Sequence, residues 1–313
     1  MVKRDRVELL QKNIEEVIRG KGEAVKMVIV TLLARGHLLI EDIPGVGKTT
    51  LAHSLARSLN STFKRIQFTS DLLPSDIIGV SIYNQKKNEF EFKKGPIFSN
   101  IILADEINRT SPKTQSSLLE AMNDNQVSVE NETYMLPKPF MVIATQNPME
   151  YHGTFPLPES QLDRFMMRLS LGYPAEKDEK QILLTQHLAL PAKEINPVLT
   201  CGDLLELQGE IEKIIVDESL IDYLLAIVSA TRRSELFGLG VSPRGAIFLY
   251  RAARALAYIE GRDYCLPDDI KILAPYIFAH RVIINARLES FGKRGEDAEK
   301  IIEEIVEGLP VPI

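Results

Sequence analysis

Short apolar runs alternate with amphipathic stretches in the first part of the chain. The apolar positions of the first stretch recur at helical spacing, at Val7, Leu10, Ile14, Val17 and Ile18. They predict helix from about residue 7 to 34, with a break at Arg19–Gly22, and a later helix is expected to end near Leu59. Buried strands are predicted at the short apolar runs 37–40, 101–104 and 140–144. Strands that are buried on both faces and alternate with helices are typical of a parallel α/β sheet.

Two segments within this part alternate between apolar and polar residues instead. Residues 80–83 and 89–92 flank a polar turn at Lys86–Asn88, and residues 126–129 and 134–136 flank a second polar turn. Each pair predicts a β-hairpin inserted between a helix and a strand.

Beyond Pro174 the pattern changes to amphipathic helices. One helix carries an apolar stripe at Leu220, Tyr223, Leu224, Ile227 and Val228. Ser242 before Pro243 predicts the start of the next helix, which Gly261 ends, and Pro267 begins another. We therefore expect an α/β domain over residues 1–174, a linker over 175–198 and a small all-α domain over 199–313.

A glycine-rich turn between the first strand and the following helix is typical of a phosphate-binding loop. Gly45 and Gly47 let the backbone turn its N–H groups toward phosphate oxygens, and the helix dipole favours the same negative charge. Lys48 can reach the β and γ phosphates of ATP, and the Thr49 hydroxyl can bind Mg²⁺. Asp42 stands where the general pattern has its first glycine. The predicted nucleotide-binding residues of this loop are Pro44, Gly45, Val46, Gly47, Lys48, Thr49 and Thr50.

Two acids follow the apolar strand 101–104. Asp105 is expected to hold Mg²⁺ and its water shell, and Glu106 to orient and polarise the water that attacks the γ phosphate. The strand 140–144 ends in a polar segment that contains Asn147. Because ligands of parallel sheets bind at the carboxyl ends of the strands, we expect these residues and the glycine loop to meet at one edge.

The composition of the chain disfavours some classes of ligand and some kinds of structural site. The chain has 313 residues, a net charge of −6 and two cysteines. An acidic balance does not favour binding to nucleic-acid phosphates, and two scattered cysteines do not favour a disulfide framework or a structural zinc site. No signal peptide and no apolar run of about eighteen residues occurs, so we expect a cytoplasmic protein without a membrane segment.

The motifs together resemble those of the AAA+ ATPases and, within them, the MoxR family. The segment 44–49 is similar to the Walker A motif of this family, which commonly has Asp at position 42, and 103–109 is similar to its Walker B motif. The segment 144–148 resembles the end of the sensor 1 strand, and the stretch 153–165 is the most distinctive for the family. The helical part matches more loosely, through 242–244 and 279–281.

This resemblance implies a P-loop AAA+ core with a helical lid, assembled into a ring that is usually a hexamer with ATP at the subunit interfaces. Asn147 would sense the γ phosphate, Arg164 would be the arginine finger for the neighbour's ATP, and Arg244 would be sensor 2. The turn that contains Ile18 and Gly20 would flank adenine. Family members act as chaperones on partner proteins, often ones with von Willebrand factor A domains.

Several alternatives remain open from the sequence. Arg109 is a rival to Arg164 for the contact with a neighbour's phosphate. A nucleic-acid motor of the related hairpin-bearing AAA+ groups would require a nucleic-acid-binding surface, for which the only basic cluster is Lys86, Lys87, Lys93 and Lys94. A module that uses ATP only to lock an assembly, and a small-molecule kinase, fit less well, because the first needs no catalytic glutamate and the second no helical lid.

Overall fold

The computed structural model describes residues 3–130, 132–148, 153–185, 195–285 and 296–312. Its centre is a five-stranded sheet in which every neighbouring pair is parallel. The strands, in their order across the sheet, are β2 (Phe63–Gln67), β5 (Ile101–Asp105), β8 (Met141–Gln146), β1 (Leu38–Glu41) and β9 (Met167–Leu169). The prediction of a parallel α/β sheet is therefore confirmed.

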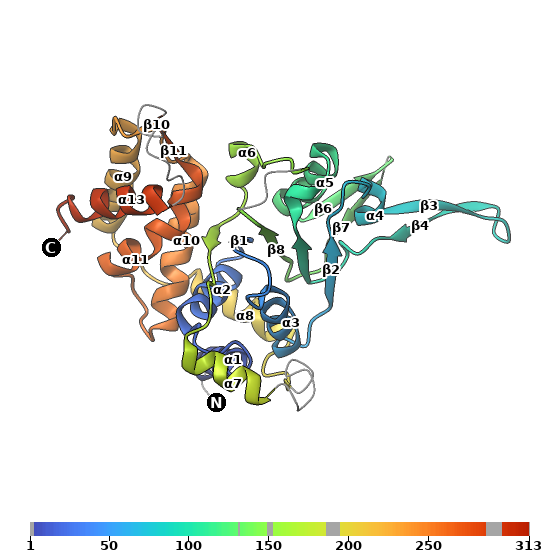
Figure 1. Ribbon diagram of the computed structural model, residues 1–313, viewed down its shortest axis with the longest axis horizontal. Helices are drawn as coiled ribbons and strands as arrows, with labels where there is room; N and C mark the ends of the chain where they lie inside the picture. Colours follow the sequence, from blue (N-terminus) through green and yellow to red (C-terminus); the bar gives the residue numbers. More distant parts are fainter. Residues whose placement is uncertain (1–2, 131, 149–152, 186–194, 286–295, 313) are drawn as a thin grey trace.

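Both faces of the sheet are covered by helices (Figure 1). Leu38 and Ile40 belong to the larger hydrophobic core, whereas Leu39, between them, belongs to a second core on the opposite face. The strand alternates in this way because successive side chains point to opposite faces. The helices of this part are α1 (Lys3–Glu15), α2 (Gly22–Leu33), α3 (Lys48–Ser58), α4 (Pro74–Ile78), α5 (Pro112–Asp124), α6 (Glu159–Leu162), α7 (Glu176–Thr185) and α8 (Cys201–Ile211), with the 3₁₀ turn η1 (Ile107–Arg109).

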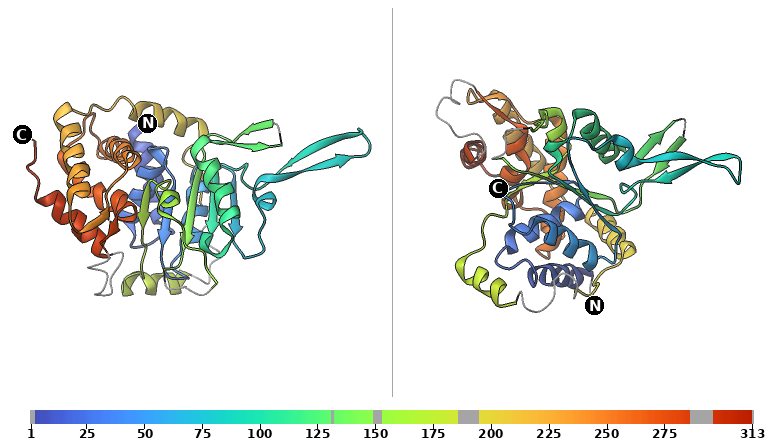
Figure 2. Two further views of the ribbon diagram at one scale, coloured as in Figure 1. Left: turned by 90° about the horizontal axis from the view of Figure 1, so that it is seen from above. Right: turned by 45° about the vertical axis from the view of Figure 1, so that its right-hand side comes forward.

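Both predicted hairpins are present. The first consists of β3 (Gly79–Asn84) and β4 (Glu89–Lys94), and the second of β6 (Gln126–Val129) and β7 (Glu132–Met135). Figures 1 and 2 show that the two hairpins project from the same side of the sheet, away from the C-terminal helices. The first hairpin reaches well beyond the rest of the molecule.

The C-terminal helices form a lid on the other side of the sheet (Figure 1). The lid consists of α9 (Glu218–Arg233), α10 (Pro243–Ile259), α11 (Pro267–Phe278), the 3₁₀ turn η3 (Ala279–Arg281) and α13 (Glu296–Glu307). Ser242 caps α10 as predicted, because its hydroxyl accepts a hydrogen bond from Gly245 N. The apolar stripe of α9 is buried, as its helical spacing predicted.

Three features of the fold escaped the sequence analysis. The strands β2 and β9 were not predicted, because β2 is largely polar and β9 is only three residues long. The expectation of helices alone beyond residue 200 is wrong in one detail, since β10 (Phe237–Leu239) pairs antiparallel with β11 (Ile283–Ile284). Strands of two or three residues are too short to show a period in the sequence, and tertiary pairing holds them in place.

A buried histidine joins three elements at the amino end of the sheet. The Nε2 atom of His37, just before β1, lies 3.0 Å from Met122 O at the end of α5, and its Nδ1 accepts a hydrogen bond from Val142 N of β8. The backbone oxygen of His37 accepts a third hydrogen bond, from Met166 N, just before β9. A neutral imidazole satisfies this arrangement, because protonated Nδ1 could no longer accept from Val142. Burial lowers the pKa of His37 from 6.5 to about 4.

This shift predicts a loss of stability in mild acid. The folded pKa lies below that of an unfolded histidine, so the contribution of His37 is complete above pH 6.5 and is lost as the pH falls toward 4. The total amounts to about 3 kcal/mol of unfolding free energy. His37→Gln should therefore show a shallower fall of the urea midpoint between pH 7 and 4.5 than the parent. His53→Gln, at a partly exposed histidine, is the control, and an unchanged slope in His37→Gln would contradict the assignment.

Candidate active site

The phosphate loop has the backbone that its glycines predict. It connects the end of β1 to the start of α3, and both Gly45 (φ 88°) and Gly47 (φ 95°) are in the left-handed region, which other residues rarely adopt. Gly47 is the N-cap of α3 and has no side chain to bond the first N–H groups of the helix. These N–H groups and the positive end of the helix dipole therefore face the loop and suit an anion.

Lys48 lies folded over this loop. Its Nζ donates to Asp42 O at 2.7 Å and to Ile43 O at 3.2 Å. Neutral carbonyl groups are weaker partners for an ammonium than phosphate oxygens, so an anion in the loop can take these bonds over. Thr49 is exposed at the first turn of α3, and Thr50 beside it is half-buried.

Asp42 ties the loop to the chain that follows β9. Its Oδ2 accepts hydrogen bonds from Leu171 N at 2.6 Å, Gly172 N at 2.7 Å and Ser170 Oγ at 3.2 Å. Its Oδ1 accepts from Ile43 N at 2.9 Å. The departure from the general glycine pattern thus has a structural role, because a glycine at this position could accept none of these bonds.

The two acids after β5 are held by different partners. The carboxylate of Asp105 accepts a hydrogen bond from Thr145 Oγ1 at 2.6 Å and forms an ion pair with Arg65 at 2.6 Å. Glu106 has a left-handed backbone (φ 58°), and its carboxylate accepts from Gln67 Nε2 at 2.7 Å. Arg65 and Gln67 were missed by the sequence analysis together with β2, although their period-2 spacing places them on one face of that strand.

A chain of polar contacts links the end of β8 to the lid. Gln146, one residue before Asn147, donates to the carboxylate of Glu41 at the end of β1. Arg168 of β9 forms ion pairs with Glu41 at 3.1 Å and with Glu299 of α13 at 2.7 Å. The last residues of β1 and β8, beside the loop, are thereby connected to the C-terminal helix.

The turn after α1 lies partly against the phosphate loop. Ile18 is buried, and a Cβ atom placed on Gly47 would lie 3.9 Å from its Cδ1. Gly20 (φ 71°) instead packs against Asp178 of α7, whose carboxylate would have to move to admit a side chain there. Of this predicted pair, the structure brings Ile18 to the loop and places Gly20 against α7.

Arg164 and Arg244 lie at the other end of the sheet. Arg164 follows α6, and Arg244 lies in the first turn of α10. Met167 of β9 pairs in parallel register with Leu38, so Arg164 precedes the amino end of the strands. Arg164 and Arg244 line a cavity of about 750 Å³ together with Lys138 and Arg251. Burial, and then the charge of Arg244, lowers the pKa of Arg164. The Nε of Arg164 is buried and has no hydrogen-bond partner within the described part of the chain.

Arg109 lies at the carboxyl end of the strands instead. It follows Glu106 in η1, and its Nε is 3.3 Å from Glu106 Oε2. The structure therefore divides the predicted residues into two groups. The loop, Asp105, Glu106, Arg109 and Asn147 share the carboxyl edge of the sheet, whereas Arg164 and Arg244 lie at the amino edge.

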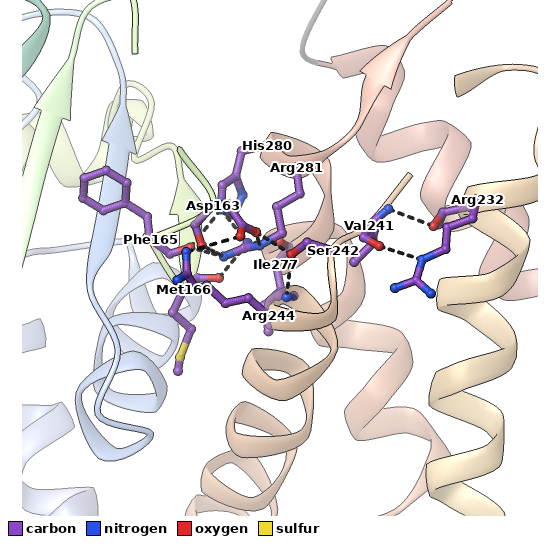
Figure 3. A network of polar contacts seen from close by, with 12 residues as sticks. Asp163, Phe165, Met166, Arg232, Val241, Ser242, Arg244, Ile277, His280 and Arg281 are labelled. Carbon is purple, nitrogen blue, oxygen red and sulfur yellow. Dashed lines mark hydrogen bonds and ion pairs between the residues drawn. The ribbon is translucent and has the colours of Figure 1, made fainter. Parts of the chain in front are cut away.

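A network of polar contacts joins Asp163, Phe165 and Met166, which flank Arg164 in the sequence, to the lid (Figure 3). Asp163 accepts hydrogen bonds from Ser242 Oγ at 2.7 Å and from Arg281 Nε at 3.0 Å, and lies 3.4 Å from Arg244 Nη1. Burial lowers the pKa of Arg281 to about 10, so this guanidinium stays charged at neutral pH. His280 adds a contact between its Nε2 and Phe165 O at 3.0 Å.

Comparison with known proteins agrees with this architecture. Residues 37–167 match the ATPase family associated with various cellular activities (AAA), and residues 229–305 match the AAA lid domain. A solved structure of a protein from Cytophaga hutchinsonii assigned as an ATPase is similar with a TM-score of 0.91 and 40% identity, covering 99% of this chain and 96% of that one.

Three relatives match most of this chain. The uncharacterized protein YeaC of Bacillus subtilis is 49% identical over 97% of this chain and 95% of its own length. The chaperone MoxR1 of Mycobacterium tuberculosis is 41% identical over 87% of this chain and 74% of its own. The protein MoxR of Methylorubrum extorquens is 29% identical over 99% and 96%, respectively. From its parallel-sheet core, its phosphate loop, its lid and these relatives, the chain is an ATPase and belongs to the MoxR family of AAA+ proteins.

Proposed function

We propose that this protein works as a ring, in which each ATP is bound by the loop of one subunit and hydrolysed with the help of Arg164 from the next. The observation that carries the proposal is the position of Arg164 at the amino edge of the sheet, opposite the loop. About 10 Å of strand separates the two ends of β1 alone, and Arg164 lies beyond the amino end. Arg164 of a subunit thus lies at the edge of the sheet opposite to its own loop.

The electrostatics at the amino edge favour the same arrangement. Beyond burial, the charge of Arg244 lowers the pKa of Arg164, and the cavity that both line is also lined by Lys138, Arg251 and one acid, Asp124, so that basic side chains are in excess. A group of like charges costs free energy unless an anion neutralises it. The triphosphate of a neighbouring subunit is an anion that suits this position. Arg109, at the carboxyl edge and beside Glu106 of its own subunit, is a weaker candidate for this role.

The carboxyl edge supplies the remaining groups. Lys48 would bind the β and γ phosphates, Glu106 would accept a proton from the attacking water, and Asn147 would orient that water beside the γ phosphate. Gln67 holds the Glu106 carboxylate in place. Ile18, packed near Gly47, would contact the adenine.

The residues at this edge also fit Mg²⁺. This ion prefers oxygen ligands and usually binds through one or two protein groups together with phosphate oxygens. The Thr49 hydroxyl and the Asp105 carboxylate are such groups, and no cluster of three or more potential metal ligands occurs among the described residues. When bound, Mg²⁺ would neutralise charge on the phosphate oxygens.

We further propose that the ring, of six subunits as is usual in the family, remodels a partner protein. The name of the Mycobacterium tuberculosis relative as a chaperone supports this role. The first hairpin is a suitable contact surface, because Val80, Ile82, Tyr83 and Phe90 are exposed on an element that projects from the molecule (Figure 1). A partner with a von Willebrand factor A domain is the expected client.

Among the described residues, no helix is long and apolar enough to cross a bilayer.

Glu106→Gln should separate nucleotide binding from turnover. The amide is isosteric but cannot accept a proton, so we expect the turnover number to fall by roughly 10²–10⁴-fold. ATP affinity, measured by calorimetry, should stay within about twofold of the parent. Glu260→Gln, which changes a lid carboxylate paired with Lys26, is the matched control and should keep the parent's rate. Turnover by Glu106→Gln at the parent's rate would contradict the assignment. The same variant should hold the client for a pull-down.

Mixing two inactive variants tests whether Arg164 acts on a neighbour. Arg164→Ala should bind ATP but lose about 10³-fold or more in turnover, because a guanidinium on the γ phosphate is worth at least that much. Glu106→Gln has the reverse defect, since its own site is inactive but its Arg164 is intact. A mixture should place intact arginines beside competent sites and exceed both variants in activity per subunit.

The control for this test is proof that mixed rings have formed. Mass measurement must show mixed rings, and the specific activity of the parent should rise with protein concentration as rings form. Mixed rings without any gain of activity would mean that Arg164 acts within its own subunit or has no part in turnover.

Nucleic acid should not be a ligand. The lysines of the first hairpin are few, and one of them, Lys87, forms an ion pair with Glu91. At near-physiological salt we expect no affinity for DNA or RNA above the non-specific range of about 10⁻⁴–10⁻⁶ M, measured by fluorescence anisotropy. Stimulation of the ATPase by single strands would instead support the nucleic-acid motor.

A further inference from the structure

We propose that Arg281, a buried residue of the lid, is a positioning residue that aims Arg164 and Arg244 at the nucleotide of the neighbouring subunit. The proposal rests on the function proposed above, in which Arg164 acts across the interface. Arg281 is only 4% exposed, so it acts through the residues that it holds and does not reach the phosphates itself.

The guanidinium of Arg281 donates hydrogen bonds to the chain on both sides of Arg164. Its Nε donates to the Asp163 carboxylate at 3.0 Å and its Nη2 to Asp163 O at 3.1 Å. Nη2 also donates to Phe165 O, and Nη1 donates to Met166 O at 3.2 Å. One lid side chain therefore bonds Asp163, Phe165 and Met166, which are three of the four residues in the segment 163–166 that contains Arg164 (Figure 3).

The same segment is bonded to the first turn of α10. Asp163 accepts from Ser242 Oγ, the N-cap of that helix, and forms an ion pair with Arg244. The Asp163 carboxylate thus forms an ion pair with Arg281 and another with Arg244, and it holds both guanidinium groups near each other. Arg164 and Arg244 share a cavity for this reason, although they are 80 positions apart in the sequence.

Arginine suits this position better than lysine does. Its planar fork presents five donors in fixed directions, whereas the three donors of an ammonium leave from one atom. The partners of Arg281 are spread around the guanidinium, and Nη1 also donates to Ile277 O in α11. A lysine could keep the charge opposite Asp163 but could not bond the carbonyls of Phe165, Met166 and Ile277 together.

These hydrogen bonds would couple the position of the lid in one subunit to the ATP site of the next subunit. Any rotation of the lid against the sheet must carry residues 163–166 with it or break these bonds. The arginines of one subunit would then move relative to the ATP of the next one. The state of one lid would thereby control the rate of hydrolysis in the neighbouring site.

Arg281→Lys tests the proposal in the mixing assay. We expect ATP affinity within about twofold of the parent and a fall in turnover of at least tenfold, because Arg164 is no longer held in one orientation. Mixing with Glu106→Gln should raise activity per subunit above both variants, since the Arg281→Lys subunit keeps a competent site. A purely structural role would damage that site as well, and mixing would then restore nothing.

A second readout needs no nucleotide turnover. The amides of Arg164 and Phe165 donate to Gln161 O and Leu162 O in the parent. Their hydrogen exchange should be at least tenfold faster in Arg281→Lys. Arg262→Lys is the matched control, because Arg262 makes a similar paired contact with Asp269 inside the lid without touching residues 163–166. It should leave both the exchange of these amides and turnover unchanged.

A milder variant covers the case in which Arg281→Lys fails to fold. Ser242→Ala removes one donor to Asp163 together with a helix cap, and Asp217→Ala removes the cap of α9 without reaching Asp163. Only Ser242→Ala should speed exchange at Arg164 and lower turnover in a way that Glu106→Gln rescues.

The outcomes separate the two proposals. If Arg164→Ala is rescued by mixing while a folded Arg281→Lys keeps parent turnover and exchange, the positioning role is wrong and the ring mechanism stands. If both variants lose turnover and neither is rescued in rings of proven mixed composition, Arg164 does not act across the interface. The positioning role of Arg281 is then also wrong, because it depends on that action.

Discussion

The common direction of the strands is the constraint on which the rest of the structure depends. In a parallel sheet every residue that follows a strand lies at one edge, and every residue that precedes a strand lies at the other. The glycine loop, Asp105 and Glu106 follow strands, and Arg164 precedes one. No packing of the helices can bring the two groups together within one subunit. Under the proposed mechanism, assembly is therefore a condition for catalysis and not an addition to it.

The lid is attached to both edges of the sheet. At the carboxyl edge Glu299 of α13 reaches Glu41 through Arg168, and at the amino edge Arg281 holds Asp163. These contacts are charged and are buried to different degrees, with Arg281 the more enclosed. A buried charge pair is costly to break, because each partner would be left without compensation. The amino-edge contact is thus suited to a permanent joint, and the more exposed carboxyl-edge contact to one that can open.

Residues whose position depends on neighbours in sequence were predictable. An apolar strand, a glycine turn and a helix start place Lys48 and Thr49, and an apolar strand alone places Asp105 and Glu106 at the same edge. The parallel sheet, both hairpins and the cap at Ser242 follow from local patterns in the same way. The strand β2 did not, because its polar residues resemble a loop, and the pairing of Arg65 with Asp105 was missed with it. The contact between Asp163 and Arg281 spans 118 positions, and no local pattern encodes such a distance.

The exception in the phosphate loop changes how the motif should be understood. Asp42 occupies the place of a glycine, yet its carboxylate accepts hydrogen bonds from two backbone amides and a hydroxyl in the segment 170–172. Engineering this position back to glycine would bring the chain closer to the general consensus while leaving the buried amide of Leu171 without its acceptor. In this chain, agreement with the general consensus and integrity of the loop are therefore opposed, because the residue that departs from the consensus is the one that holds the loop to the segment 170–172.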